Sequence, residues 1–305
     1  MKTTDVIIPC YKPGKQIEKL LSRLSRQSCP PDHILVMNTE EAYWDRELEK
    51  KYENLQVYHL TREEFDHGAT RDRGARMSQA DVLIFMTQDA LPADRDLLRN
   101  LVRSLDQDGV AASYARQLPA EDCRLIERYA RSFNYPSESR VKWESDLPEM
   151  GIKTYFCSNV CAAYKREIYL KLGGFSCPTV FNEDMLYAAK AMKAGYGVAY
   201  AADARVIHSH NYTGLQQLKR NFDLGVSQAE NREIFAGIPS EGEGFRLVKK
   251  TAAHLIRKGK PWQIFLLAWQ SGCKYAGYLL GKNHRRLPRK LILKLTGSPG
   301  YWKKK

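Results

Sequence analysis

The sequence predicts an α/β fold: a mostly parallel sheet flanked by helices, with a basic helical segment at its C-terminal end. Two observations predict the sheet: short apolar runs recur along the first two hundred residues, and stretches of helical periodicity separate them. Such alternation is typical of parallel sheets that are covered by helices on both faces. A third observation sets the end of the chain apart, because residues 244–305 contain sixteen Lys or Arg and no Asp or Glu.

The apolar runs are the predicted strands, since each is too short for a helix and is bounded by turn residues. The first, "DVIIP", precedes the turn "CYKPG", and the fourth, "DVLIFM", stops at Thr87-Gln88-Asp89. The predicted strands are residues 5–9, 33–37, 55–60, 81–86, 110–114, 160–164 and 197–201, the last of which is followed by the stretch 205–210.

Helices are predicted where apolar residues recur every three or four positions. Ile17, Leu20, Leu21 and Leu24 give the first, and Cys29-Pro-Pro31 ends it. Gly173-Gly174 and Gly195 end two others, as glycine often does. The predicted helices are residues 17–24, 70–80, one after Asp94, 166–172 and 185–194. Residues 119–150 show no clear alternation, and we expect 134–150 to be a loop that closes over a site.

Composition narrows the class of protein. The chain has 305 residues, of which 43% are hydrophobic, which is enough for a sizeable core and excludes low-complexity disorder. Its seven scattered cysteines form no paired framework, and no second Cys/His pair stands at zinc-like spacing from Cys157 and Cys161. The N-terminus enters a strand without a signal-peptide hydrophobic region, so we expect a cytoplasmic protein. We expect two domains, residues 1–228 and 229–305.

All of the excess positive charge lies in the C-terminal segment. The chain carries +13, and without residues 244–305 it has 32 basic and 35 acidic residues, or −3. An anionic partner, membrane or nucleic acid, is therefore indicated. Residues 262–281 predict a broadly apolar helix with a narrow polar or small stripe that lies in a membrane interface or packs on a partner. The stripe comprises Gln263, Gln270, Lys274, Gly277 and Gly281.

Polar side chains collect where the predicted strands end, at the edge where α/β sheets bind ligands. Three clusters stand out: Thr87-Gln88-Asp89, Glu183-Asp184 and His208-Ser209-His210. Singly, they read as a turn, a helix N-cap and structural histidines. Together, a carboxylate and a histidine can hold a divalent ion beside phosphate oxygens, and a second carboxylate can accept a proton from a hydroxyl. That set suits displacement of a nucleotide diphosphate.

Several stretches also resemble a known family. "VIIPCYKPG", "FDHGATRDRGA", "FMTQDALP", "CSNVCAAYKREIYLKLGGF", "FNEDMLYAAKAMKAGYGVAYAADARVIHSHNYT" and "QLKRNFDLGV" cover roughly residues 3–228 and are similar to family 2 glycosyltransferases of the GT-A fold, in the rhamnosyltransferase-like branch. The resemblance implies a nucleotide-sugar donor, a Mg²⁺ or Mn²⁺ ion and a single inverting displacement.

The resemblance also implies roles for individual residues. Asp89 would contact the metal, in a motif where Thr87 replaces the usual first Asp, and His208 or His210 would share the ion. Asp184 would be the general base, with Glu183 orienting it or the acceptor. The expected donor-binding residues are Pro9, Tyr11, Asn38, Glu40, Arg71, Gln88 and Asp89. Arg71 follows a turn into a helix N-terminus, a position that favours anions; pairing with Asp72 or Glu64 is the structural alternative.

The expected activity is transfer of L-rhamnose from dTDP-rhamnose to a glycan acceptor, with a UDP-hexose donor as the alternative. The acceptor is expected to be polyprenyl-linked, with the protein peripheral at the inner face of the plasma membrane through its basic segment. A dimer interface is the other interpretation of that segment. A nucleic-acid-binding protein would leave Asp89, Asp184 and the histidines without a role, and a non-catalytic binder of nucleotide sugars would explain the missing first Asp.

Overall fold

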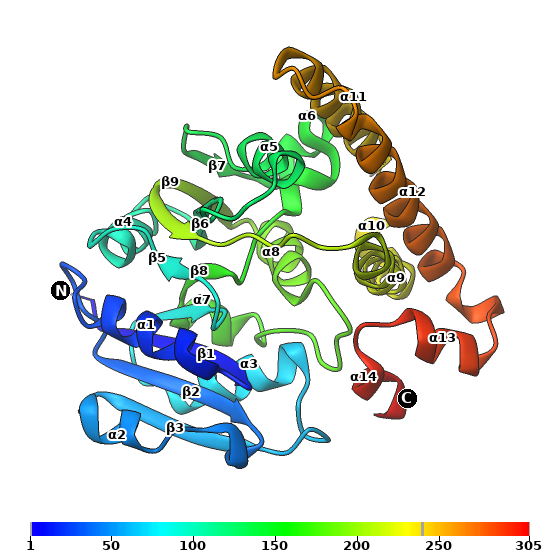
Figure 1. Cartoon of the computed structure of the whole chain (residues 1–305). Coiled ribbons are helices and arrows are strands. Elements are labelled where there is room, and N and C mark those ends of the chain that lie inside the picture. Colours follow the sequence, from blue (N-terminus) through cyan, green and yellow to red (C-terminus); the bar gives the residue numbers. More distant parts are fainter. Residues whose placement is uncertain (1, 239–240, 305) are drawn as a thin grey trace. The chain divides into compact units, whose positions relative to one another are not determined.

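The computed structural model describes residues 2–238 and 241–304, which form two compact units (Figure 1). The first unit comprises residues 1–118, 135–178 and 183–208, and the second comprises 119–134, 179–182 and 209–305. The expected division after residue 228 falls inside helix α9 (Gly214–Glu230), which lies entirely in the second unit.

The first unit is built on one sheet with the strand order β3-β2-β1-β4-β8-β6-β9-β5, and β7 pairs with β9. Its strands are β1 (Thr4–Tyr11), β2 (His33–Thr39), β3 (Leu55–Leu60), β4 (Val82–Met86), β5 (Leu91–Pro92), β6 (Val110–Leu118), β7 (Arg140–Lys142), β8 (Cys161–Lys165) and β9 (Gly197–Ile207). The predicted α/β sheet is thus confirmed. The strand expected at 197–201 continues into the stretch 205–210 and ends at Ile207, before His208.

Strand direction places the carboxyl ends of three strands together. β3, β2, β1 and β4 are mutually parallel, as are β6 and β9, whereas β8 runs antiparallel to both β4 and β6. Tyr11 is paired with Thr39 at the last position of the β1–β2 ladder. The polar residues that follow β1, β2 and β4 therefore share one edge of the sheet.

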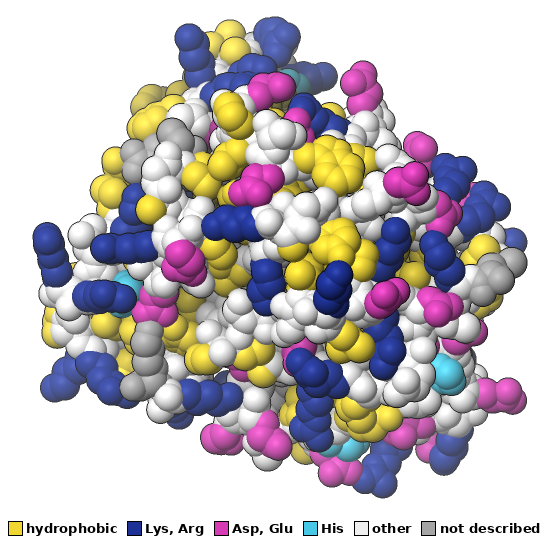
Figure 2. Space-filling model, turned by 180° about the vertical axis from the view of Figure 1, so that it is seen from behind, with side chains coloured by type: hydrophobic (Ala, Val, Ile, Leu, Met, Phe, Trp, Pro, Cys, Tyr) yellow, Lys and Arg dark blue, Asp and Glu magenta, His cyan; other side chains and the backbone are white. Residues whose placement is uncertain are grey.

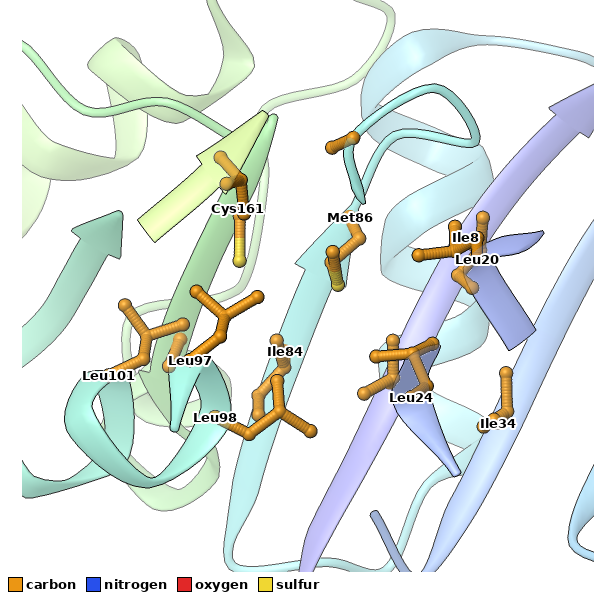
Figure 3. Packing of buried hydrophobic residues seen from close by; sticks show 14 of the residues in the cluster. Ile8, Leu20, Leu24, Ile34, Ile84, Met86, Leu97, Leu98, Leu101 and Cys161 are labelled. Carbon is orange, nitrogen blue, oxygen red and sulfur yellow. The ribbon is translucent and has the colours of Figure 1, made fainter. Parts of the chain in front are cut away.

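Helices cover both faces of this sheet. They are α1 (Gly14–Leu24), α2 (Glu47–Lys51), α3 (His67–Met77), α4 (Leu97–Arg103), α6 (Leu147–Met150), α7 (Arg166–Lys171) and α8 (Glu183–Lys193), with 3₁₀ turns at 41–43, 144–146 and 151–155. On one face Leu20 and Leu24 of α1 and Leu98 of α4 pack on Ile8 and Ile84 (Figure 3). On the other face Phe85 of β4 packs among buried aromatic rings: Tyr164, Tyr169, Phe175 and Tyr187.

Residues 134–150 are not a free loop. β7 pairs with β9, and the buried Lys142 ammonium donates hydrogen bonds to the carbonyl oxygens of Lys153 and Phe156. Burial lowers the pKa of Lys142 to about 7. The segment that we expected to close over a site is therefore anchored to the sheet along part of its length.

The second unit is helical. It contains α5 (Leu125–Asn134), α9, α10 (Arg232–Phe235), α11 (Glu241–Arg257), α12 (Gln263–Lys282), a 3₁₀ turn at 284–286, α13 (Arg289–Leu295) and α14 (Pro299–Lys304). None of the helices in the described ranges has the length and hydropathy needed to cross a membrane.

Helices α9 and α12 meet at glycines. A Cβ atom at Gly277 or Gly281 of α12 would overlap a backbone carbonyl oxygen of α9, that of Leu218 or Phe222 respectively. Both glycines are buried, whereas Trp262, Phe265 and Trp269 expose 62, 83 and 65% of their surface. The small stripe seen in the sequence is thus the packing face, and the aromatic face of α12 points outward.

This packing gives a direct stability prediction. Gly277→Ala is expected to destabilise the fold by about 1–3 kcal/mol, because the added methyl group must push two helix backbones apart. Gly272 lies on the same helix, and no atom comes within 4 Å of the position that a Cβ would take there, so Gly272→Ala is the matched control. That control should be neutral or stabilising by up to about 1 kcal/mol through helix propensity. Urea unfolding measures both, and equal midpoints for the two variants would contradict the close packing.

Candidate active site

The ends of β1 and β4 are joined by one side chain. The backbone nitrogen of Tyr11 donates to Gln88 Oε1 at 2.8 Å, and Gln88 Nε2 donates to the Tyr11 carbonyl oxygen at 3.0 Å. The Gln88 amide thereby links the two strands beyond their last backbone pair. These two hydrogen bonds hold the ends of both strands together at this edge of the sheet. Gln88 directly precedes Asp89 in the chain.

Exposed rings and cations line the outer part of this edge. Tyr11 and Tyr43 are in edge-to-face contact with ring centroids 5.8 Å apart, and they expose 36 and 45% of their surface. The Lys12 ammonium lies 4.6 Å from the Tyr43 ring centroid, and the Arg62 guanidinium lies 5.4 Å from that of Tyr11. Aromatic faces and cations next to one another suit a planar base and an anion.

Asn38 and Glu40 shape the turn after β2. Asn38 Nδ2 donates to the Glu40 carbonyl oxygen at 3.1 Å, while the buried Asn38 Oδ1 has no hydrogen-bond partner among the described residues. Glu40 adopts a positive φ of 66° and accepts a bond from the Arg62 backbone nitrogen at 2.8 Å. A buried acceptor without a partner is unusual, and it leaves Asn38 with capacity for a ligand donor. Pro9 lies in β1, opposite Met37 of β2.

Asp89 faces a histidine. Asp89 Oδ2 lies 3.6 Å from His208 Nε2, and the His208 side chain is buried. His208 Nδ1 is 3.0 Å from Gln117 Oε1, and Gln117 Nε2 donates to Ser158 Oγ at 2.9 Å. Because Gln117 Oε1 can only accept, it holds a proton on His208 Nδ1, and in the tautomer that carries only this proton the Nε2 lone pair is directed at the carboxylate.

This arrangement fits a divalent ion. A lone pair and a carboxylate oxygen facing each other repel unless a cation or proton lies between them. Two ligands that are each about 2.1 Å from an ion lie no more than about 4.2 Å apart, and the observed 3.6 Å satisfies that limit. A carboxylate oxygen suits Mg²⁺ or Mn²⁺, and because an imidazole nitrogen is a ligand typical of transition metals, the mixed pair favours Mn²⁺ of these two ions. Thr87 adds no carboxylate, and its buried Oγ1 has no hydrogen-bond partner among the described residues. His210 belongs to the second unit.

The acidic pair at the start of α8 is held by Asn159. The Asn159 backbone nitrogen donates to Asp184 Oδ2 at 2.9 Å, and its Nδ2 donates to Glu183 Oε1 at 3.1 Å. Tyr164 Oη donates in turn to Asn159 Oδ1 at 2.8 Å. Arg71 Nη1 lies 3.2 Å from Glu183 Oε1, with both side chains buried. The structure thus pairs Arg71 with Glu183, and not with Asp72 or Glu64.

The two neighbouring carboxyl groups differ in acidity. Burial, together with the adjacent negative charge of Glu183, raises the pKa of Asp184 to about 7. Burial acts in the same direction on Glu183, but the Arg71 guanidinium, His67 and the Asn159 amide outweigh it and lower the pKa of Glu183. Pairs of acids with separated pKa values are typical of acid–base catalysis. Asp184 is the member suited to exchange a proton near neutral pH.

The buried ion pair gives a prediction. Arg71→Met is expected to destabilise the fold by about 3–5 kcal/mol, because it leaves the Glu183 carboxylate buried without its counter-charge. The control is Arg76→Met on the same helix, whose partner is Asp72 at 2.7 Å and whose side chain is 57% exposed. That substitution should change stability by at most about 1 kcal/mol. Denaturant titration of both variants decides; a smaller loss for Arg71→Met than for Arg76→Met would refute the pairing.

Residues 5–173 match the family model described as Glycosyl transferase family 2. The chain belongs to this family. Two relatives of this family 2 glycosyltransferase align over 99% of its length and 96% of theirs: the O-antigen chain rhamnosyltransferases RfbN of Salmonella typhimurium (39% identical) and WbaN of Salmonella anatum (35%). The resemblance stated from the sequence motifs is confirmed, and the chain is a transferase.

Solved structures of glycosyltransferases share the fold. The mannosyltransferase PcManGT from Pyrobaculum calidifontis, in complex with GDP-Man and Mn²⁺, aligns over 99% of this chain and 86% of its own at a TM-score of 0.57 and 19% identity. Staphylococcus aureus TarS 1-349 aligns over 93% and 91% at a TM-score of 0.51 and 15% identity. The GT-A fold expected for this family 2 glycosyltransferase is therefore confirmed.

Two site residues of this glycosyltransferase escaped the sequence analysis. Gln117, which orients His208, lies in β6 but three residues beyond the strand predicted at 110–114, and Tyr43 stands in a 3₁₀ turn. Asn159 belongs to the matching stretch that begins "CSN", and it contacts both Glu183 and Asp184. The one available signal for Gln117 was an amide in a strand whose neighbours are mostly apolar.

Proposed function

We propose that this family 2 glycosyltransferase moves L-rhamnose from dTDP-rhamnose to a glycan acceptor in cell-surface polysaccharide biosynthesis. The observation that best supports this reaction is that two aspartates have different surroundings: Asp89 faces an imidazole nitrogen, and Asp184 has a pKa near neutrality. The similarity to two full-length relatives that are named O-antigen chain rhamnosyltransferases supports the choice of sugar.

Asp89 and His208 are the proposed ligands of Mn²⁺ or Mg²⁺, and His210, two residues further along the chain, is a third candidate ligand. When bound, the ion would neutralise charge that develops on the departing nucleotide diphosphate. Solved structures of the same fold were crystallised with Mn²⁺ and nucleotide or nucleotide sugar, which supports this assignment. Gln117 fixes the tautomer that makes His208 Nε2 a ligand, as outer-shell partners commonly do.

Asp184 is the proposed general base. Each of its oxygens already accepts one backbone N–H, from Asn159 or Met185, which fixes the carboxylate plane and leaves further lone pairs for an acceptor hydroxyl. The oxygen of the acceptor hydroxyl attacks the anomeric carbon while the hydroxyl proton passes to Asp184. The anomeric carbon has oxocarbenium character in the transition state. Attack opposite the leaving diphosphate inverts the anomeric centre. Glu183, held by Arg71 and Asn159, positions Asp184.

The nucleotide is proposed to bind at the outer edge of β1 and β2. Tyr11 and Tyr43 would contact the base, and Asn38 Oδ1 would accept a hydrogen bond from it or from the ribose. Arg62 and Lys12 supply positive charge beside the rings. Pro9, Glu40 and Gln88 act through the backbone that they hold in place. Arg71, whose Nε is buried without a partner among the described residues, is committed to Glu183 and acts on the donor only indirectly.

A thermal-shift donor panel with Mn²⁺ tests the choice of donor. dTDP-rhamnose is expected to raise Tm more than UDP-glucose, UDP-galactose or GDP-mannose, because only the bound donor stabilises the folded state. A larger shift with a UDP-hexose would replace rhamnose with that hexose and leave the assignment of the reaction class in place.

We further propose that the second unit docks peripherally on the inner face of the plasma membrane, where a lipid-linked acceptor would be presented. α12 buries Gly277 and Gly281 and exposes Phe265 and Trp269, and the exposed Trp262 directly precedes it. Arg257, Lys258 and Lys260 lie at the end of α11 and in the turn that follows. Lys and Arg side chains stand beside exposed hydrophobic ones on the face in Figure 2. Aromatic rings with cations suit an anionic lipid surface, whereas a homodimer through this segment would place like charges together.

Vesicle sedimentation checks the docking surface. Wild-type protein is expected to sediment with phosphatidylglycerol-containing vesicles, and Phe265→Ser/Trp269→Ser is expected to reduce the bound fraction at least about fivefold, since each ring loses about 1.5–3 kcal/mol of burial. Tyr43→Ser, an exposed aromatic of the first unit, is the control and should bind as wild type does. Equal binding by the double variant, or equal binding to neutral phosphatidylcholine vesicles, would refute the proposal.

A further inference from the structure

The second unit contains a cavity between α9, α10 and α12 that the proposed reaction does not use. Its volume is about 510 Å³, within the range of about 300–1,000 Å³ that is usual for small-molecule sites. The end of α9, α10 with the turn after it, and the last part of α12 line the cavity. All of these segments lie in the second unit, so this unit forms the cavity by itself.

The charged side chains that line the cavity are cations. They are Arg232 of α10 and Lys282 of α12, and none of the described lining residues is Asp, Glu or His. Both cations are exposed, and neither forms an ion pair with an acid in the described part of the chain. Glu230, two residues before Arg232, is paired with His284 at 3.3 Å and accepts a hydrogen bond from the Tyr301 hydroxyl. The two cations therefore lack a counter-charge, which favours an anionic ligand.

A buried amide adds a fixed hydrogen-bond donor to the lining. Gln228 is 8% exposed, and its Oε1 accepts a hydrogen bond from the Tyr278 hydroxyl at 2.8 Å. This bond orients the amide, and Gln228 Nε2 has no hydrogen-bond partner among the described residues. Because Gln228 lines the cavity, Nε2 is its polar atom left to face a ligand. A buried donor without a partner is unusual, and a ligand oxygen would satisfy it.

Tyr278 connects this amide to one of the cations. Its hydroxyl holds Gln228, and the Lys282 ammonium lies 5.1 Å from the centroid of its ring. The rest of the lining is apolar and includes Phe235 and Ile238. The cavity is also larger than a bare inorganic anion needs. Donors and cations beside an apolar wall therefore match an anion that carries an organic group.

We propose that this cavity binds a soluble phosphate ester, with its phosphate held by Arg232 and Lys282 and its organic group against the apolar wall. Guanidinium and ammonium groups both form charge-assisted hydrogen bonds with phosphate oxygens. Gln228 Nε2 donates to a further oxygen of the ligand. Binding at this site requires neither the sugar donor nor a metal ion, so the inference does not depend on the proposed function.

Isothermal titration with phenyl phosphate, phenol and inorganic phosphate tests the proposal on the full chain. EDTA is present, so that no divalent ion can recruit phosphate to Asp89. Phenyl phosphate is expected to bind at least about tenfold more tightly than phenol or phosphate. Arg232→Gln and Lys282→Gln should each weaken its binding about tenfold, the effect of losing one charged partner. Lys290→Gln removes an exposed charge of α13 that does not line the cavity, and its affinity should stay within about twofold of wild type.

Four results would overturn the proposal. Equal affinity for inorganic phosphate would mean that the organic group contributes nothing, and equal affinity for phenol would mean that the charge contributes nothing. Unchanged affinity in both Arg232→Gln and Lys282→Gln would exclude the cavity as the site. Loss of binding in Asp89→Ala, which should bind phenyl phosphate as wild type does, would place the ligand at the active site. Because Arg232 and Lys282 are exposed, both variants should unfold at the wild-type temperature, which separates loss of binding from loss of fold.

Discussion

Asp184→Asn is expected to lower the transfer rate by about 10²–10⁴-fold, the contribution of a positioned general base. The asparagine amide cannot accept the proton of the acceptor hydroxyl. Donor affinity should change little, because Asp184 contacts Asn159 and Met185 and is assigned no donor contact. Initial rates and donor titration by calorimetry measure the two quantities separately.

Thermal unfolding and the pH dependence of the rate provide the controls for Asp184→Asn. The NH₂ group of the new asparagine must face the backbone N–H of Asn159 or Met185, which places two donors together and costs about 1–3 kcal/mol of stability. Thermal unfolding measures this loss. In wild type the base form is the carboxylate, whose pKa is raised to about 7, so kcat/KM should fall as the pH drops below that value. Near-wild-type turnover by Asp184→Asn, or a rate that is flat from pH 5 to 8, would remove Asp184 as the base.

Asp89→Ala is expected to weaken Mn²⁺ binding in the presence of dTDP by more than the 10–100-fold that loss of an outer-shell partner causes. The substitution removes the carboxylate that faces His208 Nε2 at 3.6 Å. Gln117→Leu, which frees the His208 ring to change tautomer, should fall within that 10–100-fold range. Electron paramagnetic resonance of free Mn²⁺ gives each affinity without any turnover.

A matched surface acid controls for charge. Asp96 lies in the same unit, with a 42% exposed side chain paired with Arg99, and Asp96→Ala should bind Mn²⁺ as wild type does. Pulsed resonance should also detect ¹⁴N coupling from a histidine ligand in wild type, and this coupling should be weaker in His208→Ala. Equal Mn²⁺ affinity in Asp89→Ala and Asp96→Ala would show that the ion, if it binds, is held elsewhere.

Much of the first unit was predictable because its strands are long enough to show apolar runs and its helices long enough to show a period. β1, β2, β3 and β4 lie within two residues of their predicted bounds. β7 has only three residues and β5 two, too few for any period to appear. α5 was missed because residues 119–150 as a whole show no clear alternation, although the ten residues of α5 are amphipathic, and because its contacts are with α11, far away in the sequence.

The candidate site, like the fold, could be predicted only in part from the sequence. Asp89, Asp184 and His208 could be named from their order and from the family resemblance. Their partners could not, because Gln117 is 91 residues from His208 and Asn159 is 25 residues from Asp184, and only the folded sheet brings each pair together. The sequence could not predict which face of α12 packs inward for a related reason: a stripe of small residues does not reveal which helix backbone it contacts.

Release of dTDP from dTDP-rhamnose tests the central claim most directly. With Mn²⁺ and a glycan acceptor extract from the polysaccharide pathway, wild type is expected to release dTDP, EDTA to stop the release, and fresh Mn²⁺ to restore it. Both Asp184→Asn and Asp89→Ala should lose the activity, while Asp96→Ala keeps it. Release that is insensitive to EDTA and equal in all four proteins would contradict a metal-assisted sugar transfer at Asp89 and Asp184.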